Sequence, residues 1–137
     1  MSELALKLID KNKKSKAKFL DLGNCGMTVV PEELGDCIWL EELTLSNRWW
    51  DFDQQIWIDS PNTGEPNNIA RLPISMVELK NLKKFWCNGK YELPFDLSDL
   101  SLLSSLNKLE RLEISRTAVF DLGPISGLSQ LQKLHVW

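Results

Sequence analysis

The chain has 137 residues, of which 43% are hydrophobic and 26% charged, so it suits one domain with a sizeable core. Its net charge of −3 combines a basic start, residues 1–18, with an acidic remainder. An acidic body argues against a nucleic-acid-binding protein, and no apolar run approaches the roughly 20 residues that span a bilayer. Three cysteines without a C-x-x-C pair favour a reducing, cytoplasmic setting without a disulfide framework or zinc site.

The first 16 residues are expected to form a short helix with one apolar face. Its apolar residues follow the i, i+3, i+4 spacing: Leu4, Ala5, Leu8 and Ile9. Ser2 is a suitable N-cap because its hydroxyl can accept a hydrogen bond from the first turn. The lysines of this segment are interpreted as the solvated face of the helix, with an RNA-binding or membrane-binding arm as the less favoured alternative.

From residue 17 onward one pattern of apolar residues recurs. Its units lie at 19–27, 40–50, 82–90, 109–119 and 131–137. Equivalent strand residues are 23, 42, 27 and 22 positions apart: Leu20, Leu43, Phe85, Leu112 and Leu134. Two of these steps, 23 and 22, agree closely and lie within the range of known repeats of about 20–29 residues, and the other two are interpreted as that unit plus an insertion. Because L-x-L alternation buries one face of a strand, we expect the units to stack into a parallel sheet over a continuous core.

A second pattern locates the longest insertion. A proline stands 12 positions before the strand residue in two units: Pro31 before Leu43 and Pro73 before Phe85. Counting back from the second proline makes Ile69 the end of the motif that began at Leu40. We therefore expect residues 49–68 to be a loop that leaves the solenoid at the carboxyl end of a strand.

These units resemble the L-x-x-L-x-L-x-x-N/C-x-L motif of the leucine-rich repeat family, across residues 17–137 and as four or five units. The third unit departs from the motif, because Phe85 and Cys87 replace leucines and Lys90 stands at the Asn/Cys position. Cys25 and Thr117 hold the position that usually bonds neighbouring turns.

The resemblance implies an α/β fold, a leucine-rich repeat solenoid with a parallel β-sheet on its concave face. Residues 1–16 would be the N-terminal capping helix, and residues 17–137 the repeats, with the insertion at 49–68. The opening looks like the start of bacterial arrays that can head larger signalling proteins, including Roco-type GTPases, although this chain has no GTPase motif. The chain ends at Trp137 within an expected strand and without a polar cap. We expect a piece of a longer array, with burial by a second copy and a frayed natural end as alternatives.

The insertion and the concave face supply the candidate binding residues. The alternation of the strands turns Trp86 outward, at the centre of a mixed polar face, where a large aromatic is typical of a contact surface unless the insertion covers it. The insertion combines aromatic residues with carboxylates and ends in the turn-forming SPNTGEPNN. It is too apolar to remain free in water, so we expect it to dock on its own solenoid as a β-hairpin or short helix. An exposed tip would then select basic groups through its carboxylates.

No arrangement of residues predicts catalysis or metal binding. His135 is expected to project outward and Cys87 inward, so the two would not form a nucleophile and base. Phosphate-binding, H-E-x-x-H and calcium-loop motifs are absent from the sequence. Asp51, Asp53 and Asp59 lack the spacing of an EF-hand. We therefore expect no enzyme, no cofactor and no metal.

The sequence thus predicts a non-enzymatic module that binds a protein partner through its concave face and the 49–68 loop, without nucleic acid or membrane. The predicted contact residues are Trp49, Trp50, Phe52, Asp53, Trp57, Asp59, Trp86, Glu113, Arg116 and His135. One alternative is an inhibitor or immunity-type protein whose acidic loop blocks a basic active site. Another is the sensor domain of a larger signalling enzyme. Self-association through the C-terminal solenoid end or the loop is a further possibility.

Overall fold

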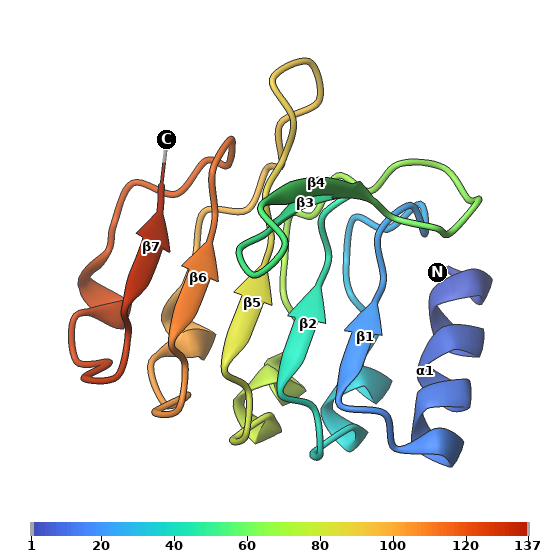
Figure 1. The fold of residues 1–137 in the computed structure, drawn as a ribbon, viewed down its shortest axis with the longest axis horizontal. Coiled ribbons are helices and arrows are strands. Elements are labelled where there is room, and N and C mark those ends of the chain that lie inside the picture. Colours follow the sequence, from blue (N-terminus) through green and yellow to red (C-terminus); the bar gives the residue numbers. More distant parts are fainter. Residues whose placement is uncertain (1, 137) are drawn as a thin grey trace.

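The computed structural model describes residues 2–136, which form a solenoid behind a single curved layer of strands (Figure 1). After helix α1 (Glu3–Ser15) come the strands of a five-stranded parallel sheet: β1 (Phe19–Asp21), β2 (Glu42–Thr44), β5 (Lys84–Trp86), β6 (Arg111–Glu113) and β7 (Lys133–His135). The strands lie in chain order, so each repeat adds one strand. This arrangement confirms the predicted fold. Trp137, which was expected to lie within the last strand, is outside the described residues.

Short 3-10 turns form the opposite side of the solenoid. They are η1 (Glu32–Asp36), η2 (Ile74–Glu78), η3 (Ser101–Leu103) and η4 (Gly123–Ile125), and they stack on one another in this order. The Glu32 carboxylate joins the first two turns, because its oxygens accept hydrogen bonds from the backbone N–H groups of Ile74 and Ser75, each at 2.9 Å. These bonds lower the pKa of Glu32.

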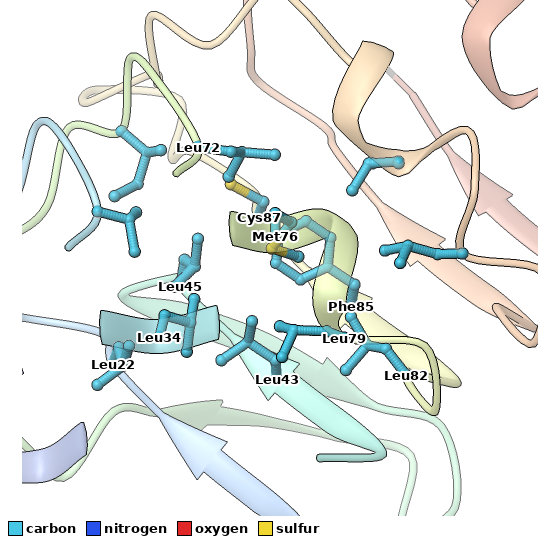
Figure 2. Close-up of a cluster of buried hydrophobic side chains, with 14 of the residues drawn as sticks. Leu22, Leu34, Leu43, Leu45, Leu72, Met76, Leu79, Leu82, Phe85 and Cys87 are labelled. Carbon is cyan, nitrogen blue, oxygen red and sulfur yellow. The ribbon is translucent and has the colours of Figure 1, made fainter. Parts of the chain in front are cut away.

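The core lies between the sheet and these turns. The middle residues of the strands are in register and point into it: Leu20, Leu43, Phe85, Leu112 and Leu134. Figure 2 shows how Leu43 and Phe85 meet Met76 and Leu79 of the second turn region. Burying each such side chain stabilises the fold by about 1.5–3 kcal/mol. Stacking the repeats therefore produces the continuous core that the alternation predicted.

Helix α1 covers the first repeat, as the spacing of its apolar residues predicted. Ala5 and Ile9 are buried, and the Ser2 hydroxyl accepts a hydrogen bond from the N–H of Ala5 at 3.1 Å. The same hydroxyl donates to the carbonyl of Cys25 at 2.6 Å, which ties the start of the helix to the first repeat. At the other end, the indole of Trp39 donates to the buried side chain of Asn12 at 2.7 Å.

One buried side chain, Asn67, holds the first two repeats together. Its oxygen accepts hydrogen bonds from the N–H groups of Cys25 and Met27, at 3.1 and 2.9 Å. Its amide group donates to the carbonyls of Leu22 and Leu45, at 2.8 and 3.0 Å. Asn67 therefore forms the hydrogen bonds between repeats that were expected of the motif's Asn/Cys position. The second repeat thus resumes at Asn67, within residues 49–68, which were expected to be a loop.

Two expectations about this position were wrong. Thr117 donates to the carbonyl of Ile114 and so bonds within its own turn. The Cys25 thiol donates to the carbonyl of Gly23 and also accepts a hydrogen bond from the side-chain amide of Asn62 at 4.0 Å, in the inserted segment. In the third unit, Lys90 is not at the motif position, because the chain makes an extra loop at 88–94 and Phe95 fills the core instead. The start of this loop requires glycine, since a Cβ on Gly89 would lie 2.4 Å from the carbonyl oxygen of Arg116.

Candidate functional site

The insertion is a β-hairpin that folds over the outward face of the sheet, near the carboxyl ends of its strands (Figure 1). Strand β3 (Arg48–Asp51) pairs antiparallel with β4 (Ile56–Asp59). Beneath it, two outward rows cross the sheet: Phe19, Glu42, Lys84, Arg111 and Lys133; then Asp21, Thr44, Trp86, Glu113 and His135. The docked hairpin was one of the two forms expected from its composition.

Trp49 anchors the hairpin. Only 7% of it is exposed, and its ring lies between Trp86 and Phe19, with ring centroids 4.8 and 5.7 Å away. The indole N–H of Trp86 donates to the carbonyl of Trp50 at 3.1 Å, which adds a directed contact. As a result Trp86 is only 3% exposed. Of the two roles expected for Trp86, an open contact residue or a residue covered by the insertion, the structure shows the second.

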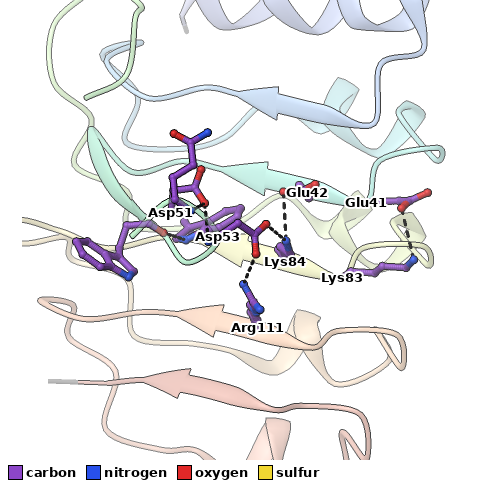
Figure 3. Close-up of polar contacts among 10 residues, drawn as sticks. Glu41, Glu42, Asp51, Asp53, Lys83, Lys84 and Arg111 are labelled. Atoms are coloured by element: carbon purple, nitrogen blue, oxygen red, sulfur yellow. Dashed lines mark hydrogen bonds and ion pairs between the residues drawn. The ribbon is translucent and has the colours of Figure 1, made fainter. Parts of the chain in front are cut away.

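The hairpin tip bonds to the sheet through charges (Figure 3). The Asp53 carboxylate lies 3.5 Å from Lys84 Nζ and 3.8 Å from an Arg111 nitrogen. The Arg111 guanidinium also lies over the ring of Phe52, 4.8 Å from its centroid. At the other end of the hairpin, Asp59 pairs with Arg48 at 3.5 Å. Two carboxylates that were expected to select a partner's basic groups therefore lie beside cations of their own chain.

An open groove of about 560 Å³ lies between the hairpin and the loops that follow β5 and β6. The hairpin contributes Arg48, Trp50 and Trp57; the 88–94 loop contributes Asn88, Gly89, Lys90, Tyr91 and Glu92; the following repeats contribute Glu113, Ser115, Arg116 and His135. Both walls are insertions. They converge because each leaves the solenoid at the carboxyl end of a parallel strand, and these ends lie along one edge of the sheet.

The groove gathers half of the ten predicted contact residues. They are Trp50, Trp57, Glu113, Arg116 and His135. The other five lie in the hairpin or beneath it and do not line the groove: Trp49, Phe52, Asp53, Asp59 and Trp86. Reasoning from the sequence missed Tyr91, which is 80% exposed and has the Arg116 guanidinium 5.1 Å above its ring. The 27-residue step between Phe85 and Leu112 was the available signal, because it marks extra residues at this point.

Asn88 fixes the floor of the groove. Its backbone N–H donates to the Ser46 hydroxyl, and its side-chain oxygen accepts from the N–H of Ser115, both at 2.8 Å. Its amide nitrogen donates to Oε1 of Glu113 at 3.0 Å. The backbone and side chain of this one residue thus link the second, third and fourth repeats beneath the groove, and the side chain orients the Glu113 carboxylate.

Glu113 is the buried acid of this site, with 3% of its surface exposed. Its Oε2 is buried without a hydrogen-bond partner within residues 2–136. Burial raises the pKa of Glu113, although the bond from Asn88, the nearby His135, the indole of Trp86 and the charge of Arg111 act in the opposite direction. The floor of the groove therefore holds a desolvated carboxyl group that is only partly satisfied.

The thiols lie away from the groove and in the core. Burial raises the pKa values of Cys25 and Cys37 to about 11, and raises that of Cys87 further. Within residues 2–136 there is no cluster of three or more His, Cys, Asp or Glu side chains that could hold a metal ion. Over the same residues, no helix has the length and apolar character to cross a membrane.

Comparison with known proteins identifies the architecture. A solved structure of a leucine-rich repeat protein from Leptospira interrogans matches 93% of this chain, with a TM-score of 0.54 and 20% sequence identity. The chain has the leucine-rich repeat fold. It spans 33% of the length of the Leptospira protein. No family model matches the sequence, and no curated protein does.

Two internalins of Listeria monocytogenes are also similar to this leucine-rich repeat chain. Internalin C2 matches 98% of this chain and 74% of its own length at 15% identity, with a TM-score of 0.38. Internalin F matches 97% of this chain and 49% of its own length at 20% identity, with a TM-score of 0.39.

Proposed function

We propose that the chain is a non-enzymatic protein-binding module whose contact surface is the groove between the hairpin and the 88–94 loop. The observation that carries this proposal is the pair of insertions, which enclose a groove with exposed aromatic side chains. Trp57 is 54% exposed and Tyr91 is 80% exposed, on opposite sides of it. Large aromatics contribute most of the binding energy at many protein interfaces, and loops on a rigid scaffold commonly carry binding sites.

The proposed binding surface is narrower than the concave face and 49–68 loop predicted from the sequence. The hairpin already occupies much of that face, so a partner would meet the outer side of the hairpin and the groove beside it. Trp50 and Trp57 form this outer side, with ring centroids 5.3 Å apart. Trp49 and Trp86 would then support the site from beneath and would not touch the partner.

Capture experiments test the proposal. The immobilised chain is incubated with lysate of the organism that encodes it, and captured proteins are compared for the wild type, Trp57→Ala and Tyr91→Ala. Ile74→Ala is the matched control, because Ile74 is 73% exposed on η2, on the far side of the solenoid. We expect both groove variants to lose specific partners that the wild type and the control retain. Equal capture by all four proteins would contradict the proposal.

The inhibitor hypothesis has weaker support than a general binding role. A loop that plugs a basic active site needs free carboxylates, whereas Asp53 and Asp59 lie beside Lys84, Arg111 and Arg48. Membership of a larger signalling protein, a cytoplasmic location and self-association through the solenoid end or the hairpin stay predictions. Light scattering of the wild type and Trp57→Ala at two salt concentrations tests the last of them.

A further inference from the structure

We propose that the groove receives a basic side chain of the partner, a lysine or an arginine, and that Glu113 is the acid that contacts it. This inference rests on the proposed function, since it specifies the chemistry of the partner at the same groove. Its basis is the unsatisfied carboxylate oxygen of Glu113 together with the aromatic walls around it.

The first argument concerns the hydrogen bonds of Glu113. Asn88 satisfies Oε1 at 3.0 Å, whereas Oε2 is buried without a partner within the described chain. A buried carboxylate with an unsatisfied oxygen is costly for the fold. An ammonium or guanidinium group supplies both a donor and a compensating charge, and such charge-assisted bonds are stronger than neutral ones. Because Oε2 is buried, a basic side chain reaches it only when the side chains over it move aside, and the bond formed would then remove a cost that the free chain bears.

The second argument concerns the walls. Trp50, Trp57 and Tyr91 line the groove, and aromatic faces attract cations. Rings of this groove already lie beside guanidinium groups: Arg48 is 5.2 Å from the centroid of Trp57, and Arg116 is 5.1 Å from that of Tyr91. The aliphatic stem of a lysine or arginine would pack on the indoles while its charged end reaches Glu113.

The groove also contains positive charges, which would oppose a basic ligand. Arg48 pairs with Asp59 at 3.5 Å, so its charge is partly compensated. Arg48 and Arg116 are exposed, and water screens exposed charges far more than buried ones. Lys90 is half-buried, and Glu92 lies on the same loop. Because Glu113 is the most deeply buried charged group in the groove, its charge acts most strongly on a group that enters it.

The test uses small probes, so it does not depend on finding the partner. The ¹⁵N-labelled chain is titrated at neutral pH with N-acetyl-argininamide, N-acetyl-lysinamide and the neutral N-acetyl-glutaminamide, while the indole N–H signals of Trp50 and Trp57 are followed by NMR. We expect saturable shifts with the two basic probes, with weak dissociation constants on the order of 1–10 mM. The neutral probe should give shifts that do not saturate.

Two variants assign the effect to Glu113 and the walls. Glu113→Gln keeps the shape of the side chain and the acceptor for Asn88, and should weaken the basic probes by about tenfold or more. Trp57→Leu changes an exposed residue, so it should fold normally and weaken them several-fold. Glu33→Gln removes an exposed carboxylate on η1, remote from the groove, and should bind like the wild type.

Two results would overturn the inference. One is saturation by N-acetyl-isoglutamine, an acidic probe, at lower concentrations than the basic probes need. The other is unchanged binding of the basic probes to Glu113→Gln. Either result, combined with loss of partner capture in Trp57→Ala, would leave the proposed function standing and remove only the assignment of a basic ligand.

Discussion

Replacing Asn67 with alanine should be among the most destabilising single changes in this chain. The side chain is completely buried and makes four hydrogen bonds to backbone groups of the first two repeats. Each such bond contributes about 1 kcal/mol net, and more when the group left behind is buried without a partner. The expected loss is therefore about 4 kcal/mol or more, which is a large part of the 5–15 kcal/mol that a typical domain has.

Urea unfolding followed by tryptophan fluorescence measures this loss. With a slope of about 2 kcal/mol per M, Asn67→Ala should lower the midpoint by about 2 M. Asn68→Ala is the matched control, since the neighbouring Asn68 makes two exposed bonds with Asp96, at 3.0 and 3.1 Å. Its midpoint should fall by less than about 0.5 M. Similar midpoints for the two variants would refute the view that Asn67 holds the first two repeats together.

Three further outcomes are expected. Because burial raises the pKa of Glu113 in the folded chain, its ionisation opposes folding, so stability should fall as the pH rises through that pKa. The stability of Glu113→Gln relative to the wild type should therefore increase as the pH is raised above about 4, measured by urea unfolding at each pH. Trp49→Ala should cost about 3–5 kcal/mol. Asp53→Asn should cost less than about 1 kcal/mol, because the Asp53 side chain is 72% exposed. Equal costs for the two variants would contradict docking through Trp49. The three buried cysteines should react with a thiol reagent slowly in the native chain and completely in urea, as absorbance assays would record.

The sequence was sufficient to predict the repeats because the signal for them is local and periodic. Leu20, Leu43 and Leu112 stand at strand spacing in units of similar length, and burial of one strand face leaves a single consistent register. The helix was predictable for the same reason, since Ser2 and the apolar face of residues 4–9 lie within a few turns of each other. The two insertions obscured the motif after the second and third strands, so the return of the repeat at Asn67 and Phe95 was missed.

The site was only partly predictable because it depends on contacts between segments distant in the chain. The composition of the insertion showed that it must dock, but the partner of Trp49 is Trp86, 37 positions away, and no local pattern specifies that pair. Likewise, Tyr91 appeared to belong to a poorly matching repeat, and only the fold places it opposite Trp57. The charge pattern was misleading for Asp53, because the cations that neutralise it come from two other repeats.

The hairpin leaves and rejoins the solenoid at nearly the same point. The N–H of Ser60 donates to the carbonyl of Asn47 at 3.0 Å, and the N–H of Asn67 donates to the side-chain oxygen of Asn47 at 2.9 Å. The two asparagines therefore close the excursion where it meets the stack of repeats. Asn47 and Asn67 thus preserve the register of the stack across the excursion, so substitutions at exposed positions such as Trp57 can reshape the groove while Trp49 keeps the hairpin docked.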